Sequence, residues 1–243
     1  MSIASYVIDV SGFQPPDRVN WLDPRIGAGI VKATEAATWR SKSTALHMAA
    51  MRRAQDVRLN STDPAVDVLQ LGLYHFFHPD VSALAQFQNF CQVADLANYG
   101  IGDIIPAIDI ESYLTRSATG SHDNPITPAW SEPAEDLCRL LTARYGDCML
   151  YCTKLGWKAM GSPGWLLEHD LWVAQYAMNG HLPFQTCTAS PGDKAPKLFQ
   201  NYVGPMWGAI TGKLTNTASP VGVDQNKLYG DFKLIDAVVD VAA

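Results

Sequence analysis

Short apolar segments recur along the chain, and over much of its length longer amphipathic stretches separate them. Three of these stretches have apolar residues at helical spacing: Ser43–Val57, Val81–Asn98 and Glu132–Tyr145. Eight apolar segments have the length of strands: Tyr6–Val10, Ala28–Lys32, Leu69–Phe77, Ile104–Ile110, Met149–Thr153, Leu171–Tyr176, Leu198–Val203 and Val221–Asn226. The alternation predicts an α/β fold, a barrel of strands and helices that becomes irregular in its last third, where no helical pattern separates the last two strands.

The fourth strand segment ends in two carboxylates, Asp109 and Glu111. Side chains alternate along a strand, so this spacing predicts that both acids face the same side, with Cα atoms about 6.5–7 Å apart. Two neighbouring acids resist ionising together, which raises at least one pKa and suits a general acid at neutral pH. Taken alone, the pair also fits a strand that ends in solvated acidic residues. The stretch that follows, Ser112–Ser131, is rich in Ser, Thr and Pro and predicts a long loop.

Polar and aromatic residues stand at nearly every strand end. Active sites of (β/α) barrels lie at the carboxyl ends of the strands. The candidate residues at these positions are Asp9, Glu35, Tyr74, Asp109, Glu111, Tyr151, Tyr176, Gln200 and Asp224. Carboxylates handle anomeric chemistry and aromatic rings stack on sugars, so the pattern indicates a carbohydrate site. His75 alternates with Tyr74 and is predicted to face away from it, as a core histidine.

Composition narrows the class of protein further. The 243 residues are 47% hydrophobic and 17% charged, which allows one sizeable core. A net charge of −6 without a long basic cluster argues against a nucleic-acid partner. No apolar run approaches the ~20 residues of a membrane span, so no membrane insertion is expected. The five cysteines have neither CxxC nor zinc spacing and are predicted to be reduced structural thiols, with no metal site.

Several short motifs resemble one family in the same order along residues 6–231. They are the opening Ile8-Asp9-Val10-Ser11, then Lys32-Ala33-Thr34-Glu35, Tyr74-His75-Phe76, Asp109-Ile110-Glu111, Tyr151-Cys152-Thr153, Leu171-Trp172-Val173-Ala174-Gln175-Tyr176 and Val223-Asp224-Gln225-Asn226. Each motif is weak by itself, but seven in order resemble the glycoside hydrolase family 25 lysozymes. Ala36, Phe13 and Gln175 depart from residues that are usual in this family, which bears on substrate preference.

The resemblance implies an irregular TIM-like (β/α)5(β)3 barrel with N-acetylmuramidase activity and neither metal nor cofactor. This activity cleaves the β-1,4 bond between N-acetylmuramic acid and N-acetylglucosamine in peptidoglycan. Glu111 would be the general acid, and Asp109 would assist it, with the substrate's acetamido group as a possible nucleophile. Asp9 and Asp224 would complete the catalytic acids. Substrate-binding candidates are Tyr74, Tyr151, Tyr176, Glu35 and Gln200.

Two other functions stay open at this stage: a chitinase-like glycosidase and a non-catalytic peptidoglycan-binding barrel. The longer acidic signature DxxDxDxE of the chitinases is absent before Asp109. The presence of all four acids argues against a barrel that only binds.

The expected biological setting follows from the resemblance and from the chain's N-terminus. Residues 1–243 are expected to form a single catalytic barrel without a separate cell-wall-binding domain, and to act as a monomer on peptidoglycan glycan strands. The first residues lack the basic and apolar regions of a Sec signal peptide. We therefore expect synthesis in the cytoplasm and action on the cell wall or periplasm after phage lysis or specialised secretion. A delivered effector would need an immunity protein.

Overall fold

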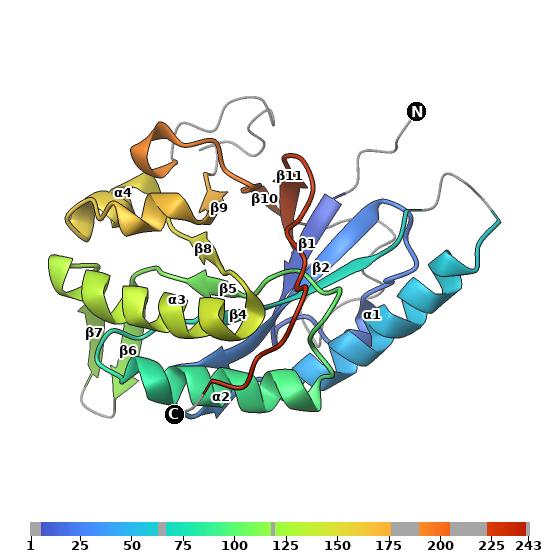
Figure 1. Ribbon diagram of the computed structural model, residues 1–243, viewed down its shortest axis with the longest axis horizontal. Helices are drawn as coiled ribbons and strands as arrows, with labels where there is room; N and C mark the ends of the chain where they lie inside the picture. The colour runs from blue at the N-terminus through green and yellow to red at the C-terminus, as the bar shows by residue number, and fades with distance from the viewer. Residues whose placement is uncertain (1–5, 63–66, 118–119, 176–189, 205–222, 242–243) are drawn as a thin grey trace.

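Eight strands close into a barrel in the computed structural model, which describes residues 6–62, 67–117, 120–175, 190–204 and 223–241 (Figure 1). Around the barrel the strands follow the order β1-β11-β10-β9-β8-β5-β4-β2, and β2 pairs with β1 to close it. Their bounds are β1 Tyr6–Val10, β2 Ile26–Glu35, β4 Gln70–Phe76, β5 Ala107–Asp109, β8 Met149–Tyr151, β9 Asp170–Ala174, β10 Leu198–Gly204 and β11 Val223–Leu228. The predicted barrel is confirmed, although several strands are shorter than expected.

The direction of one strand decides which residues reach the functional end of the barrel. Every barrel pairing is parallel except those of β11, which runs antiparallel to both β1 and β10. Asp224 therefore lies near the start of β11, and the register places it opposite Asp9 of β1. Because β11 is reversed, its beginning lies at the same end of the barrel as the carboxyl ends of the other strands.

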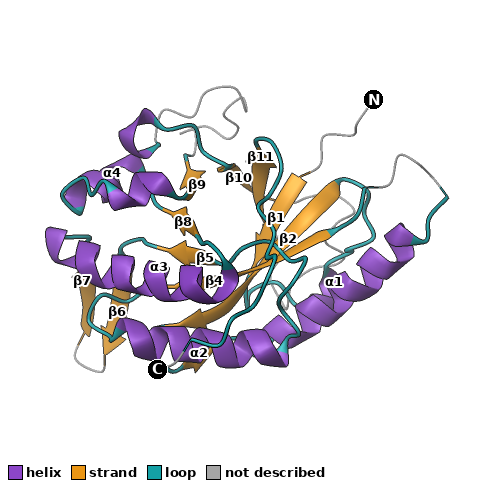
Figure 2. Cartoon of the chain, viewed as in Figure 1, coloured by secondary structure: helices purple, strands orange, loops and turns teal. Residues whose placement is uncertain are grey.

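Helices cover the outside of the barrel (Figure 2). They are α1 Thr44–Leu59, α2 Ala83–Leu96, α3 Ser131–Tyr145 and α4 Lys154–Ala159, with short 3-10 helices at Pro16–Arg18, Pro128–Trp130, Trp165–Glu168 and Pro191–Asp193. The buried residues of α3, among them Leu137, Cys138 and Leu141, recur at three- and four-residue spacing. Gly146 ends α3 with a φ of 86°, a conformation that glycine adopts without steric cost.

The predicted loop at Ser112–Ser131 is wrong in part. Strands β6 Tyr113–Ser117 and β7 Gly120–Asn124 pair as an antiparallel hairpin that projects beside α3 (Figure 1), and the 3-10 helix follows them. The two strands were not predicted because their composition is largely polar. A two-stranded ribbon outside the core needs no alternating apolar face. A short strand β3, Trp39–Arg40, also pairs with the end of β2.

The predicted reduced state of all cysteines is wrong for two of them. Cys138 of α3 and Cys148 form a disulfide with Cα atoms 6.3 Å apart, within the range that this bond requires. The turn at Gly146 brings the end of α3 back to the start of β8, which spacing in the sequence did not reveal. Cys91 and Cys152 are free and buried, and Cys187 lies outside the described residues.

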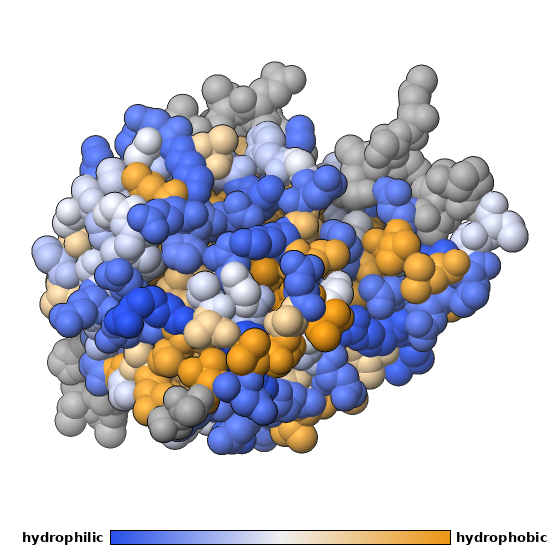
Figure 3. Space-filling model, in the orientation of Figure 1, coloured by the Kyte–Doolittle hydropathy of each residue, from blue (hydrophilic) through white to orange (hydrophobic). Residues whose placement is uncertain are grey.

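Polar side chains dominate the face shown in Figure 3, and apolar ones gather where the C-terminal segment crosses α2. Exposed apolar residues of these two elements include Leu96 and Val239. Across the described ranges, none of the helices has the length and apolar character needed to cross a membrane.

Candidate active site

Four carboxylates surround Tyr74 at the carboxyl end of the parallel strands. Tyr74 is half-buried, and its partial removal from water raises the pKa of its phenol well above the usual value. Repulsion from Asp9, Asp109, Asp224 and Glu111 raises the same pKa further, so all four acids lie close enough to act on one side chain. The structure therefore brings together the four acids predicted from the sequence.

Asp9 and Asp224 form a hydrogen-bonded pair across β1 and β11. Burial raises the pKa of both carboxyl groups, and the charge of Asp224 raises that of Asp9 further. A hydrogen bond between two carboxyl groups needs a proton on one of them, so the pair holds a proton to higher pH than isolated aspartates do. Such a pair can supply or accept a proton with little rearrangement.

Buried amides hold this pair in place. Asn226 is fully buried and donates from Nδ2 to Asp9 Oδ2 at 2.8 Å, while its Oδ1 accepts a 2.7 Å bond from Trp172 Nε1. Gln200 of β10 is buried and forms a side-chain hydrogen bond with Asp224. The role of Asn226 was not predicted from the sequence, although its position two residues after Asp224 on one strand places both on the same face.

The second carboxylate pair lies at the end of β5. Asp109 is the last residue of the strand and is buried, whereas Glu111 lies two residues beyond it and is exposed. The expected common strand is therefore wrong for Glu111, because β5 pairs with its neighbours only through Asp109. The two acids nevertheless interact, since burial first and Glu111 second raise the pKa of Asp109 well above its usual value.

Glu111 has the properties expected of a proton donor. Reduced hydration beside the protein raises its pKa, and nearby Lys32 opposes this shift. One oxygen of Asp109, Oδ1, and one of Asp224, Oδ1, are buried without a hydrogen bond to the described protein atoms. The site thus combines an exposed acid with buried acceptor oxygens that a substrate donor could satisfy.

A network of charged and aromatic residues holds Lys32 next to the acids. Lys32 Nζ lies 2.7 Å from Glu35 Oε2 and 4.4 Å from the ring centroid of Phe76. His78 Nε2 donates to Glu35 Oε1 at 3.1 Å, and its ring stacks on Tyr113 of the hairpin at 4.0 Å. Hydrogen bonds from His78 and then Lys32 lower the pKa of Glu35 to about 2 despite its partial burial. Glu35 is therefore an ionised anchor for Lys32.

Two of the aromatic candidates, Tyr74 and Tyr151, contact the same buried ring, that of Trp172. Trp172 packs edge-on against Tyr74 and Tyr151, with ring centroids 5.9 Å and 5.2 Å apart, and is itself buried. Tyr151 remains half-buried, and Tyr176 lies outside the described residues. His75 is a core histidine as predicted, bonded to the side chains of Thr34 and Gln86.

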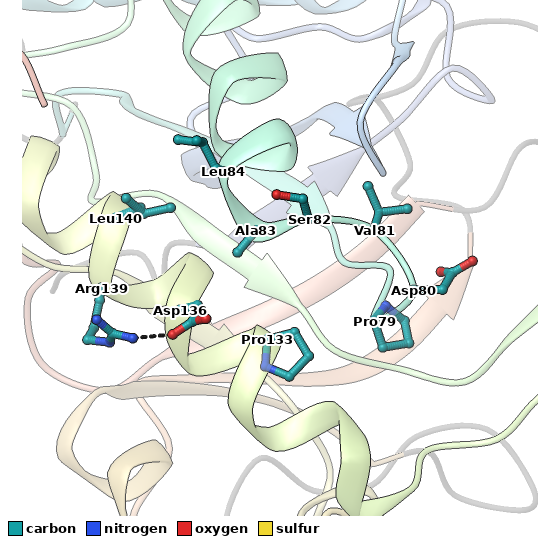
Figure 4. Close-up of a pocket in the computed structure, with 10 residues that line it drawn as sticks. All are labelled: Pro79, Asp80, Val81, Ser82, Ala83, Leu84, Pro133, Asp136, Arg139 and Leu140. Carbon is teal, nitrogen blue, oxygen red and sulfur yellow. Dashed lines mark hydrogen bonds and ion pairs between the residues drawn. The ribbon is translucent and has the colours of Figure 1, made fainter. Parts of the chain in front are cut away.

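A cavity of about 550 Å³ opens elsewhere, between the start of α2 and α3 (Figure 4). Its lining residues are Pro79, Asp80, Val81, Ser82, Ala83, Leu84, Pro133, Asp136, Arg139 and Leu140. The two charged residues on α3, Asp136 and Arg139, pair with each other rather than pointing a free charge into the cavity. None of the four clustered acids lines it, so the carboxylate site is the better candidate for chemistry.

Comparisons with known proteins agree with this geometry. The sequence profile of "Glycosyl hydrolases family 25" matches residues 8–192. No curated protein sequence matches the chain. A muramidase from Acremonium alcalophilum has 19% sequence identity and a TM-score of 0.63, over 93% of this chain and 94% of the other.

Two further solved structures share the fold. A bacterial lysozyme from Streptomyces coelicolor has 18% identity and a TM-score of 0.64, over 93% of each chain. The catalytic domain of endolysin ply40 from Listeria monocytogenes bacteriophage P40 has 17% identity and a TM-score of 0.63, over 94% of this chain and 95% of that domain. At these identities the structures establish a common barrel fold.

Proposed function

Because the chain belongs to glycosyl hydrolase family 25 and is a glycoside hydrolase, we propose that it is a peptidoglycan N-acetylmuramidase. The bond cleaved is the β-1,4 linkage from N-acetylmuramic acid to N-acetylglucosamine. The observation that carries the proposal is the cluster of four acids around Tyr74, whose pKa each of them raises. The muramidase and the bacterial lysozyme among the solved structures with this fold support the same substrate class.

Glu111 is the proposed general acid. Its raised pKa keeps a proton available, and its exposure leaves the carboxyl accessible to a glycosidic oxygen. As the bond to the leaving sugar breaks, this proton passes to the leaving oxygen. Glu111, then ionised, accepts a proton from the water that completes hydrolysis.

Asp109 is the proposed partner of the substrate's acetamido group. The acetamido carbonyl oxygen attacks the anomeric carbon, and its N–H donates to buried Oδ1 of Asp109, which has no partner among the described protein atoms. A carboxylate at this position stabilises the positive charge that develops on the sugar and acetamido group. Water then opens the cyclic intermediate, and the product keeps the configuration of the substrate. Inverted product immediately after cleavage would exclude this route.

The remaining predicted residues receive supporting roles. Asp9 and Asp224 supply a buried, proton-sharing pair near the reacting centre, and Gln200 positions Asp224. Tyr74 and Tyr151 are proposed to contact the sugar from the floor of the barrel mouth, and Tyr176 is proposed to stack on it. Glu35 is proposed to act through Lys32 and not on the substrate directly, because its two carboxylate oxygens already accept hydrogen bonds from Lys32 and His78.

Product analysis tests the proposal directly. Purified peptidoglycan is digested, reduced with borohydride and examined by mass spectrometry. We expect reduced muramic acid ends, formed about 10²- to 10⁴-fold more slowly by Glu111→Gln, and at the normal rate by Glu168→Gln, which changes an exposed glutamate of the 3-10 helix Trp165–Glu168. Reduced glucosamine ends would contradict the proposed bond. Cleavage of chitin oligomers instead would identify a chitinase-like enzyme, and tight binding without products would identify a binding barrel.

The proposed site of action is the cell wall. Peptidoglycan glycan strands are the partner, and the enzyme acts as a monomer. It reaches the wall or periplasm after phage lysis or through specialised secretion, and in the second case an immunity protein protects the producing cell. Neighbouring genes distinguish the two routes: a holin gene indicates phage lysis, whereas a secretion-spike gene with a small secreted neighbour indicates an effector.

A further inference from the structure

Two cysteines and a histidine meet at the barrel end opposite the acids. Cys148 directly precedes β8, His169 directly precedes β9, and Cys138 lies on the inner face of α3. One potential ligand atom from each residue lies within 4.8 Å of the other two. The residues are 10 and 21 positions apart in sequence, so only the packing of α3 against these strands brings them together.

The histidine is oriented as metal-ligating histidines are. His169 Nδ1 lies 2.9 Å from Asp147 Oδ1, while Nε2 faces Cys138 Sγ at 3.4 Å. The second carboxylate oxygen of Asp147, Oδ2, lies 2.6 Å from Lys233 Nζ, so the carboxylate is fixed behind the ring. This contact orients the imidazole with Nδ1 toward the carboxylate and Nε2 toward the sulfur, the arrangement in which Nε2 can bind a metal.

The disulfide offers Nε2 no hydrogen-bond donor. A disulfide sulfur carries no proton, so it cannot donate a hydrogen bond to the imidazole. When the bond is reduced, Cys138 offers a thiol proton to Nε2, or two thiolates and the imidazole offer three ligands to a cation. Two thiolates and one histidine are a ligand set that favours zinc, and a carboxylate behind the histidine is its usual support.

We propose that Cys138, Cys148 and His169 form a redox-gated Zn²⁺ site. A reductant such as a water-soluble phosphine cleaves the disulfide, takes the oxygen of one water to become a phosphine oxide, and leaves two thiols that carry the water's two protons. Zn²⁺ then displaces both thiol protons and binds the two sulfurs and Nε2. Asp147, held by Lys233 at 2.6 Å, positions His169. The disulfide and the metal exclude each other, because both use the same sulfur atoms.

Metal analysis of the full chain tests the site. The protein is reduced under nitrogen, freed of phosphine, incubated with a zinc salt, desalted and assayed by mass spectrometry for zinc. We expect one Zn²⁺ per chain in the reduced protein and in Cys91→Ser, a control that removes a different buried thiol. The oxidised protein should bind no Zn²⁺, and reduced His169→Gln should bind none either. Because His169→Gln keeps both cysteines, formation of its disulfide under oxidising conditions shows that the variant is folded. Asp147→Asn should weaken zinc affinity by about 10- to 100-fold.

Cobalt gives a second readout, since Co²⁺ bound to thiolate shows a charge-transfer absorption that Cys138→Ser should remove. Circular dichroism follows the fold throughout. Reduced, folded protein that takes up no zinc would overturn the proposal, as would equal uptake by His169→Gln and wild type. If reduction unfolds the chain, zinc should restore the native spectrum, and failure to restore it would also overturn the site.

Discussion

The two carboxylate pairs of the active site are controlled in different ways. Asp109 and Glu111 are two residues apart at one strand end. The positive charge of Lys32 lowers the pKa of both, against the rise caused by burial. Asp9 and Asp224 come from the two ends of the chain and are held by hydrogen bonds to each other and to buried amides. Burial raises the pKa of all four acids. Beyond burial, the charge of Lys32 lowers the pKa in the first pair and hydrogen bonds adjust it in the second, so different substitutions should disturb them.

The largest effect is expected for Glu111→Gln. Glutamine cannot donate a proton to the leaving oxygen, so kcat on soluble peptidoglycan fragments should fall by about 10²- to 10⁴-fold. Because the fold also raises the pKa of Glu111, loss of its charge should leave the thermal midpoint at pH 7 unchanged or higher. Near-normal kcat in a folded variant would remove Glu111 from the role of general acid.

Asp109→Asn should separate activity from stability. The fold raises the pKa of Asp109 above 3.8, so the ionised carboxylate is disfavoured in the folded state, and a neutral side chain relieves this cost. Thermal unfolding at pH 7 should therefore show a higher midpoint for the variant, with lower activity. The gain should vanish as the pH falls below 3.8, where aspartate is protonated in both states. An unchanged or lower midpoint at pH 7 would contradict the expected repulsion.

Asn226→Ala should lower the stability of the fold, whereas Asp109→Asn should raise it. It leaves Trp172 Nε1 and Asp9 Oδ2 buried without this partner, so the free energy of unfolding should fall by about 1–3 kcal/mol. Urea unfolding monitored by tryptophan fluorescence measures the loss. The control Asn20→Ala changes an exposed asparagine and should cost less. Equal losses in the two variants would argue against a positioning role for Asn226.

The smallest expected effect is a change of pH profile in Lys32→Met. Lys32 favours the ionised form of Glu111, so its removal should raise the pKa of the acid. The acid then stays protonated to higher pH, and the alkaline limb of the kcat profile should move upward. Lys42→Met removes an exposed charge and serves as the control. A limb that stays in place, or moves to lower pH, would show that Lys32 does not tune Glu111.

Much of the fold was predictable because strands and helices have local signatures. Tyr6–Val10 was predicted with its final bounds, and α3 within one residue, since an apolar run and a three- to four-residue period are visible in sequence. The hairpin at β6 and β7 was not predicted, because its polar strands lack such a period. The shortening of β5 also escaped prediction, since pairing partners on both sides decide where a strand ends.

The sequence by itself determined the barrel and the identities of the acids, because strand ends and family motifs are local patterns. Only the tertiary structure decided how these residues act on one another. Closure of β1 onto reversed β11 places Asp9 opposite Asp224, and the packing of α3 joins Cys138 to Cys148 beside His169. The physical reason is the same in both cases: hydrogen bonds and covalent bonds act over a few ångströms in space, and residues far apart in sequence reach that range only when the chain has folded.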